Sequence, residues 1–367
     1  MWAIRRPLVL GIETSCDDTA CAVLDGDGRV LSSIVSSQLA VHGPYGGVVP
    51  EIASREHLAN WLPVSEQALA EAGVRMAELD AVAATRGPGL VGALLVGLAL
   101  GKALAFALGK PFHAVHHLEG HLYSPFLHDG TGAAALPAAA PPARFHGLVL
   151  SGGHSSLFAV REGSIETLGE TRDDAFGEVF DKVGKRVGLP YPQGPRVDQL
   201  AERGDASAYR LPVPACGDTL DFSFSGLKSQ TLTEIERLER RLGALGSRPA
   251  EELPQAVLDL LAAFRAAAVA QVLDRLERLE RMDGGGAGTS VPLAVSGGAA
   301  ANRLLRRELP AWSARHGSEL RLVPLVYAGD NAAMIAHAAL LRHARGLADD
   351  PFAAEAESRI PLGPGGR

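Results

Sequence analysis

Two histidines, His117 and His121, stand four residues apart in the run His-Leu-Glu-Gly-His. On a helix, residues at this spacing lie on one face, one turn apart, where both imidazoles can hold a single metal ion. A chain with 12 histidines also produces such pairs by chance, so solvated or capping histidines are the alternative. Glu119 lies roughly 200° around a helix from both histidines. The metalloprotease motif His-Glu-x-x-His places its glutamate beside the metal, and the pattern here fits that class poorly.

The candidate third ligand is Asp330, which precedes an apolar segment that is predicted to be a helix. Its alternative role is that of a helix N-cap, which is common for aspartate. As a ligand it would complete a set of two histidines and one carboxylate, which leaves open positions for substrate on zinc or iron. A second acid, Asp181, follows Phe180. The two phenylalanines Phe176 and Phe180 indicate that this stretch of the chain has a buried side. Asp181 is therefore less easily explained as a solvated charge.

Two Ser-Gly-Gly loops, Ser151–Gly153 and Ser296–Gly298, each follow a segment that is predicted to be a strand. Glycine lets backbone N–H groups approach an anion closely, and the second loop also precedes a predicted helix, whose N-terminus favours anions. Each loop alone is a weak sign, because glycine turns after strands are common, but the pair predicts a nucleotide site. The motif G-x-x-x-x-G-K-[ST] does not occur in the sequence, which excludes the P-loop class.

The segments that must position these residues repeat one pattern. Apolar runs at 8–12 and 20–24 flank a polar turn, and the same arrangement returns at 148–150 and 157–160. A strand, a polar turn and a second strand at the start of each half predict a duplicated α/β fold, with two lobes around a nucleotide cleft. Two unrelated hairpins are the alternative that this pattern leaves open.

Hydrophobic patterning and turn residues outline the rest of the chain. The hydrophobic pattern predicts helices at 51–72, 90–109 and 253–282, and strands at 80–84, 111–115 and 291–295. We expect a first lobe at 1–128, a linker rich in Ala, Pro and Gly at 129–145, a second lobe at 146–348 and a tail at 349–367. In this division the first lobe carries the histidines, and the second carries both Ser-Gly-Gly loops and Asp330.

Composition restricts the classes of partner and compartment. With 367 residues, of which 47% are hydrophobic, the chain can bury the cores of two domains. A net charge of −7 and a pI near 6.0 argue against binding nucleic acid through bulk positive charge. Any RNA contact then needs a local patch, for which the candidates are Arg55, Arg237–Arg241 and Arg303–Arg307. The three cysteines form no C-x-x-C pair, so a reduced cytoplasmic compartment is expected.

The segment 90–109 is apolar and about as long as a membrane-spanning helix. It contains Lys102, and a central lysine costs about 2.5–3.5 kcal/mol on insertion. It also contains four glycines, which favour close packing against other elements. We therefore expect a fully buried core helix here and no membrane partner.

A series of ordered motifs resembles the family of tRNA N6-adenosine threonylcarbamoyltransferases, once described as O-sialoglycoprotein endopeptidases. The opening signature is Gly-Ile-Glu-Thr-Ser-Cys-Asp-Asp-Thr at 11–19, and the resemblance covers roughly residues 8–340. The other matching motifs lie at 45–55, 87–97, 116–121, 151–154, 180–182, 221–228, 296–302 and 330–331. Three positions depart from the family pattern: Asp18 in place of Glu, Gln193 in place of Gly, and Gly329 in place of Thr.

The resemblance implies an actin-like fold (the sugar kinase, Hsp70 and actin class) with duplicated RNase H-like lobes. It implies transfer of a threonylcarbamoyl group from threonylcarbamoyl-AMP to N6 of the adenosine 3′ of the anticodon, position 37, in tRNAs that read codons starting with A. By motif position, the metal ligands are His117, His121 and Asp330, with Fe²⁺ expected and Zn²⁺ as the alternative. The acids Asp17 and Asp18 are assigned to catalysis. The adenylate-binding set is Val149, Leu150, Ser151, Gly152, Gly153, Asp181, Gly194, Asp198 and Asn302.

The resemblance also implies partners, namely a paralogous actin-like subunit and a P-loop ATPase, while a separate synthase supplies the adenylate. Four other functions are alternatives to this one. They are a metalloprotease, an actin-like kinase or ATPase, a non-haem iron oxygenase and a subunit that only binds. A kinase or ATPase would need a Mg²⁺ site built on acids, which direct histidine ligation suits poorly. The retained pair of histidines and Asp330 argue against a silent subunit.

Overall fold

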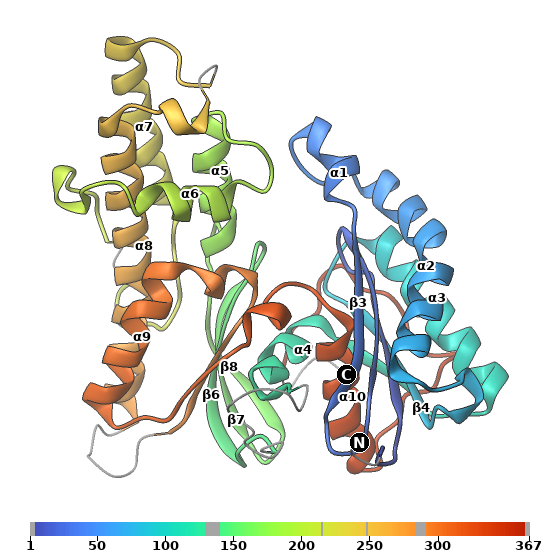
Figure 1. Ribbon diagram of the computed structural model, residues 1–367. Coiled ribbons are helices and arrows are strands. Elements are labelled where there is room, and N and C mark those ends of the chain that lie inside the picture. Colours follow the sequence, from blue (N-terminus) through green and yellow to red (C-terminus); the bar gives the residue numbers. More distant parts are fainter. Residues whose placement is uncertain (1–3, 129–139, 214–215, 247–248, 284–290, 364–367) are drawn as a thin grey trace. The chain divides into compact units, whose positions relative to one another are not determined.

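The structure is a computed structural model, and it describes residues 4–128, 140–213, 216–246, 249–283 and 291–363 (Figure 1). Residues 129–139, most of the predicted linker, therefore lie outside the described part. The chain divides into two compact units. Unit 1 contains Met1–Pro142 and Val323–Arg367, and unit 2 contains Ala143–Leu322.

Unit 1 is built on a five-stranded mixed sheet with the order β3-β2-β1-β4-β5. β1 pairs antiparallel with β2 and parallel with β4, so the hairpin predicted around the opening signature is confirmed. The edge strand β5 pairs parallel with β4 and leads directly into the helix that bears the histidines. The strands are β1 (Val9–Glu13), β2 (Asp18–Leu24), β3 (Val30–Ser37), β4 (Ala81–Gly87) and β5 (Phe112–His116).

The sheet of unit 2 has the order β10-β9-β6-β7-β8, which repeats the topology of the first sheet. β6 pairs antiparallel with β7 and parallel with β9, as β1 does with β2 and β4. The predicted duplication is thus present in the strand connections. The strands are β6 (Arg144–Leu150), β7 (Ser155–Arg161), β8 (Ser164–Glu170), β9 (Leu293–Ser296) and β10 (Leu320–Leu322).

Helices cover both faces of the first sheet. Successive side chains of a strand point to opposite faces, so strands that are apolar throughout need cover on both sides. On β1, Leu10 and Ile12 belong to the core beneath α2 and α3. Gly11 points the other way, and a Cβ built there would lie 2.3 Å from the Ala332 carbonyl, so α10 can approach β1 this closely only over glycine. The helices of unit 1 are α1 (Leu39–His42), α2 (Pro50–Ala72), α3 (Val91–Leu108), α4 (His117–Tyr123) and α10 (Ala332–Ala344).

α10 corrects the division expected from the sequence, which placed residues up to 348 in the second lobe. This helix packs on β1, β2, β4, β5 and α4, so the chain returns to unit 1 after β10. Asp330, at its N-terminal end, therefore lies in the same unit as the two histidines. Sequence order alone gave no sign of this return, since the last helix follows the second sheet without a break in composition.

α3 and α8 are the two described helices long and apolar enough to cross a membrane. α8 is 72% buried over its most apolar window, as expected for a core helix, whereas α3 is only 33% buried. The prediction that α3 would be fully buried is therefore wrong. One side of α3, with Leu94 and Leu98, is buried, and the opposite side, with Val91 and Leu95, is exposed.

In unit 2, the sheet and the helices pack together in one large hydrophobic core, which includes much of α8. Phe176 stacks on Phe180, and Phe180 contacts Phe264 of α8 with tilted rings, which confirms that the Phe176–Phe180 stretch has a buried side. The helices of this unit are α5 (Phe176–Arg186), α6 (Gln193–Ala201), α7 (Ser225–Leu242), α8 (Gln255–Met282) and α9 (Arg303–His316).

Candidate functional site

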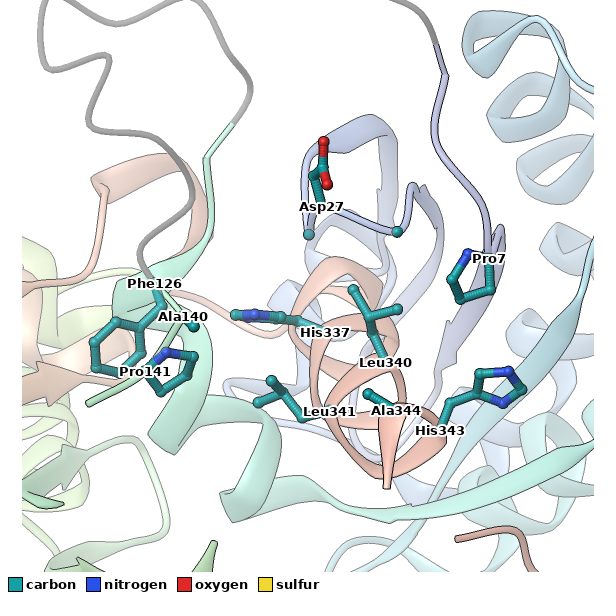
Figure 2. A pocket seen from close by; sticks show the side chains of 12 residues that line it. Pro7, Asp27, Phe126, Ala140, Pro141, His337, Leu340, Leu341, His343 and Ala344 are labelled. Carbon is teal, nitrogen blue, oxygen red and sulfur yellow. The ribbon is translucent and has the colours of Figure 1, made fainter. Parts of the chain in front are cut away.

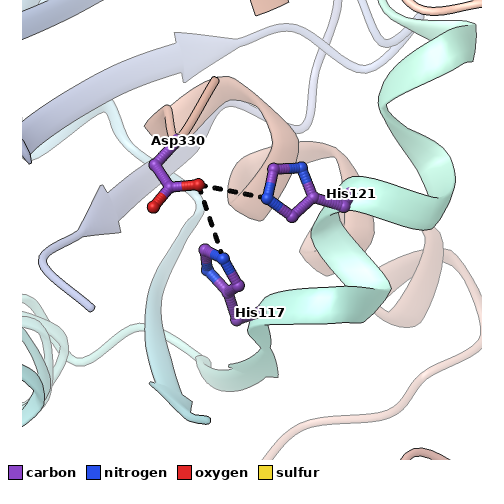
Figure 3. A group of neighbouring side chains, drawn as sticks. All are labelled: His117, His121 and Asp330. Carbon is purple, nitrogen blue, oxygen red and sulfur yellow. Dashed lines mark hydrogen bonds and ion pairs between the residues drawn. The ribbon is translucent and has the colours of Figure 1, made fainter. Parts of the chain in front are cut away.

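The short helix α4 presents His117 and His121 toward Asp330 (Figure 3). β5 ends at His116, whose Nδ1 accepts a hydrogen bond from the Leu118 N–H and so caps the helix. Asp330 lies just ahead of α10, whose N-cap is Asn331 rather than Asp330. The capping role considered for Asp330 is thus taken by its neighbour, and the Asp330 carboxylate is directed to the histidines.

The three side chains suit a divalent metal ion. His117 Nε2 lies 3.5 Å from Asp330 Oδ1, and His121 Nε2 lies 3.1 Å from the same oxygen. One possible ligand atom from each of the three residues lies within 4.8 Å of the other two. Ligands held at about 2.0–2.2 Å around one tetrahedral ion are roughly 3.4 Å apart. Both histidines are buried, while Asp330 is partly exposed.

Glu13, which the sequence analysis did not single out, holds His117 in place. Its Oε2 lies 3.0 Å from His117 Nδ1 and accepts a 2.7 Å hydrogen bond from the Thr85 hydroxyl. Since Nδ1 is held by this carboxylate, Nε2 is the nitrogen that faces Asp330. Carboxylates that orient metal-binding histidines in this way are common.

Electrostatics around His117 favour a positive charge at this position. Burial alone lowers the pKa of His117, but the carboxylates of Asp330 and Glu13 outweigh it and raise the pKa to about 9. In the absence of metal the imidazole is therefore protonated at neutral pH. A cation that binds Nε2 takes the place of this proton, so metal affinity should rise with pH.

Asp17 precedes β2, and Asp18 is its first residue, near enough to Asp330 and Glu13 for their negative charges to act on it. Asp18 Oδ1 is buried and has no hydrogen-bond partner among the described residues. Burial, together with the negative charges of Asp330, Asp17 and Glu13, raises the pKa of Asp18 to about 7, although a hydrogen bond with Ser37 opposes the shift. A carboxyl with this pKa can exchange a proton near neutral pH, which is a property of general acids and bases.

The two Ser-Gly-Gly loops lie side by side in unit 2. Val149 pairs with Ser296 across the parallel strands β6 and β9, and a Cβ on Gly297 would meet the Leu150 carbonyl at 2.2 Å. Gly152 and Gly153 are exposed, and a Cβ on either would meet no atom within 4 Å. Val149 and Leu150 are fully buried, so neither presents a side chain to a ligand.

The remaining residues of the predicted adenylate set lie in the same unit, where Asp181 and Gly194 form a pair and Asp198 and Asn302 make separate contacts. Asp181 Oδ1 accepts a 2.7 Å hydrogen bond from the Gly194 N–H. Asp198 Oδ2 accepts a 3.1 Å bond from the N–H of Arg303, the residue after Asn302. Asn302 itself caps α9 through a 3.0 Å bond from the Leu305 N–H. Asp198 is also bound by the buried Arg265, at 3.2 Å.

A family model described as tRNA N6-adenosine threonylcarbamoyltransferase (TsaD) matches residues 29–337. The chain belongs to this family. A family protein of that name from Pelobacter propionicus is 48% identical over 332 residues, which are 90% of this chain and 90% of the relative. One from Sorangium cellulosum is 45% identical over 360 residues, which are 96% of this chain and 97% of the relative.

A similar solved structure supports the fold class of this chain. HypF from T. kodakarensis has a TM-score of 0.58 at 15% identity, covering 94% of this chain and 48% of that chain. At this identity the likeness concerns the fold alone. Together with the repeated sheet topology, it confirms the α/β, actin-like fold that the resemblance implied.

The arginine patches considered for RNA binding are partly neutralised within unit 2. Arg237 pairs with Glu234 at 2.6 Å, and Arg240 lies 3.9 Å from Glu236. Arg303 and Arg307 lie 3.9 Å and 3.7 Å from the acids Asp198 and Glu202. These residues therefore add less positive surface than the sequence indicates.

A cavity of about 290 Å³ lies beside α10 and contains none of the predicted site residues (Figure 2). It is lined by the β2–β3 turn at Gly26–Gly28, by Phe126 and by α10 residues that include His337. His337 is buried, and this burial lowers its pKa to about 4. The cavity is mainly apolar, and His337 stays neutral there at physiological pH.

We expect His337 to make the protein less stable in acid. Its folded-state pKa of about 4 lies below the value of 6.5 for a free histidine, so the unfolded chain binds more protons between these values. The free energy of unfolding should therefore fall as the pH is lowered through this window, by up to about 3 kcal/mol from this group. Urea denaturation of wild type and His337→Gln at about pH 7 and about pH 5 measures the effect. Equal losses of stability in both proteins would contradict it.

Proposed function

We propose that this chain transfers the threonylcarbamoyl group of threonylcarbamoyl-AMP to N6 of the adenosine at position 37, in tRNAs that read codons starting with A. The observation that carries the proposal is the match to the tRNA N6-adenosine threonylcarbamoyltransferase family over residues 29–337. The cluster of His117, His121 and Asp330 adds support, because the motif positions that the resemblance assigned to metal binding lie together.

The reaction forms a bond between N6 and the carbonyl carbon and breaks the bond from that carbon to the phosphate oxygen, which leaves with AMP. A divalent cation held by His117, His121 and Asp330, for which we propose Fe²⁺ with Zn²⁺ as the alternative, would polarise the carbonyl as a Lewis acid. The amine must also lose a proton. We assign this proton to the pair Asp17 and Asp18, since the raised pKa of Asp18 lets it accept a proton near pH 7.

Residues of unit 2 are proposed to hold the AMP part of the donor. The exposed backbone of Gly152 and Gly153 offers N–H groups to the phosphate, in a loop where no side chain intervenes. Asp198 and Asn302 are proposed to contact the nucleoside, with Asp198 fixed by Arg265 and by the Arg303 N–H. An adenine amine is a poor nucleophile, so holding the donor in position contributes much of the rate.

The position of Glu119 argues against a metalloprotease. Glu119 is buried, and its carboxylate is bonded to the His116 backbone and lies 4.0 Å from Arg342, away from the His117–His121 face. A zinc protease needs a carboxylate beside the metal to activate water. Direct histidine ligation in turn suits the Mg²⁺ site of a kinase or ATPase poorly.

tRNA is the substrate class of the family, and we propose that the chain acts on it in the cytoplasm together with a paralogous actin-like subunit and a P-loop ATPase. Unit 1 offers an exposed apolar surface for such a partner along α2 and α3, which lie next to each other (Figure 1). Leu58 and Leu62 on α2 and Val91 and Leu95 on α3 are each 44–63% exposed. Apolar side chains grouped in this way are typical of protein interfaces.

The experiment that tests this function is mass analysis of anticodon-loop nucleosides from cells depleted of the protein. We expect threonylcarbamoyl-adenosine to fall and unmodified adenosine at position 37 to rise by the same amount. Re-expression of wild type should restore the modification, and re-expression of Asp330→Asn should not. Unchanged threonylcarbamoyl-adenosine after depletion would overturn the proposal.

A further inference from the structure

α4 is too short to hold its orientation alone. It has seven residues, whereas isolated helices shorter than about 12–15 residues are marginal in water. The direction in which His117 and His121 point is therefore set by contacts that α4 makes with the rest of unit 1. Besides Glu13, which holds His117, and α10, which packs against Gly120, a further set of these contacts involves residues that no step of the proposed reaction uses.

The first set of contacts centres on Arg342 of α10. Its Nη1 donates to the Ala114 carbonyl at 2.9 Å and lies 4.0 Å from Glu119 on the back of α4. Its Nη2 donates to both carboxylate oxygens of Asp349, at 3.2 and 3.1 Å. Asp349 Oδ2 also accepts a 2.9 Å bond from the Ala114 N–H. One arginine thus ties together β5, α4 and the segment that follows α10.

The segment from Asp349 to Ile360 runs along the strand that leads into α4. The Asp349 N–H donates to the Phe112 carbonyl at 2.9 Å, so the segment pairs with the edge strand β5 at that point. Farther along, Lys102 Nζ donates to the Ala354 carbonyl at 2.8 Å, and the Glu357 N–H donates to the Arg86 carbonyl at 2.9 Å. A Cβ on Gly87 would lie 2.0 Å from the Glu357 carbonyl, so the segment lies directly on this turn.

The segment ends at the cap of α4. His116 accepts from the Leu118 N–H through Nδ1, which leaves Nε2 to donate to the Ile360 carbonyl at 3.1 Å. The side chain that begins the metal helix is therefore held between the helix and the C-terminal segment. A shift of this segment would turn the cap, and with it the first ligand, His117.

We propose that Asp349–Ile360 is a brace that sets the orientation of α4, and that Arg342, Asp349 and His116 are positioning residues of the metal centre. The proposal rests on the metal role of His117, His121 and Asp330 under the proposed function. It goes further by assigning part of the metal affinity to residues that do not touch the ion. Arg342 is required as an arginine, since a lysine cannot donate to Ala114 and Asp349 in this fixed geometry.

The test uses Co²⁺ as the probe, with the purified full-length chain. Asp349→Asn should weaken Co²⁺ binding about 10-fold and change the visible absorption spectrum of the bound ion, because outer partners of metal ligands contribute about 10–100-fold to affinity. Arg342→Lys should behave in the same way. Asp350→Asn is the matched control: among the described side-chain contacts, the exposed carboxylate of this neighbour accepts only the Phe352 N–H, which an asparagine can also accept, so affinity and spectrum should be unchanged.

A chain that ends at Ser358 provides a second, milder variant, because it loses the Ile360 carbonyl but keeps the Asp349 and Glu357 contacts. It should also lower Co²⁺ affinity, and its melting temperature without metal should remain close to that of wild type. Wild-type affinity and spectrum in Asp349→Asn, Arg342→Lys and the shortened chain would overturn the brace alone. If wild type and His117→Ala bind Co²⁺ equally, the proposed metal site fails, and the brace fails with it.

Discussion

Replacing His117 by alanine should remove bound metal and lower the rate of threonylcarbamoyl transfer by more than about 100-fold, since changes to outer partners of ligands already cost about 10–100-fold. His117 supplies one of the three clustered ligand atoms, and its Nε2 faces Asp330 because Glu13 holds Nδ1. The variant should remain folded. Glu13 keeps its hydrogen bonds from the Ser15 N–H and the Thr85 hydroxyl, so its buried carboxylate is not left without donors.

Elemental analysis of the purified proteins and a single-turnover transfer assay measure this result. His316→Ala is the matched control, because His316 lies on α9 of unit 2 and pairs with Glu277. Circular dichroism and the melting temperature establish whether each variant is folded. Equal metal content in wild type and folded His117→Ala would show that the metal lies elsewhere.

Gly152→Val should abolish the rise in melting temperature that AMP, or a stable mimic of threonylcarbamoyl-AMP, produces in wild type. Binding to the folded state alone stabilises a protein by about 2.7 kcal/mol at 100 times the dissociation constant, which is a readily measured shift. A side chain at Gly152 would meet open space in the free protein, so the substitution should not disturb folding. It would, however, occupy the position from which the backbone reaches the phosphate.

A graded series makes this experiment specific. Gly152→Ala should lose part of the AMP-induced shift and Gly152→Val all of it. Gly43→Val is the matched control in unit 1, where a Cβ also meets no atom within 4 Å, and it should keep the full shift. If Gly152→Val retains the shift, the β6–β7 loop is not the phosphate site.

The metal cluster could be predicted from sequence in part only. The i, i+4 spacing of His117 and His121 and the motif at Asp330 singled out three residues that do lie together, because helical periodicity and family motifs are local properties. Glu13 was missed, since its contact with His117 joins residues 104 positions apart and no pattern along the chain encodes it. Asp330 was assigned to the wrong lobe because its contacts with unit 1 also join residues far apart in the sequence.

The repeated strand pattern was predictable, because alternating apolar residues and polar turns recur in both halves. The partial exposure of α3 could not be predicted, since an apolar helix on the outside of a sheet has the same composition as a helix in the core. Arg342 and Asp349 likewise had no signal, because their partners are backbone groups of β5. Tertiary contacts of this kind depend on which elements pack together, and this information is not present in any single segment.

The return of the chain to unit 1 orders events during synthesis. Translation proceeds from the N-terminus, so β1–β5 and α4 leave the ribosome long before residues 323–367, which complete that unit. Until α10 arrives, the face of β1 around Gly11 has no covering helix, and both histidines lack their carboxylate partner. A polypeptide released early would therefore hold two ligands without the third. Under the proposed function, only a copy translated through α10 would hold all three ligands, so metal acquisition would report that α10 has been made.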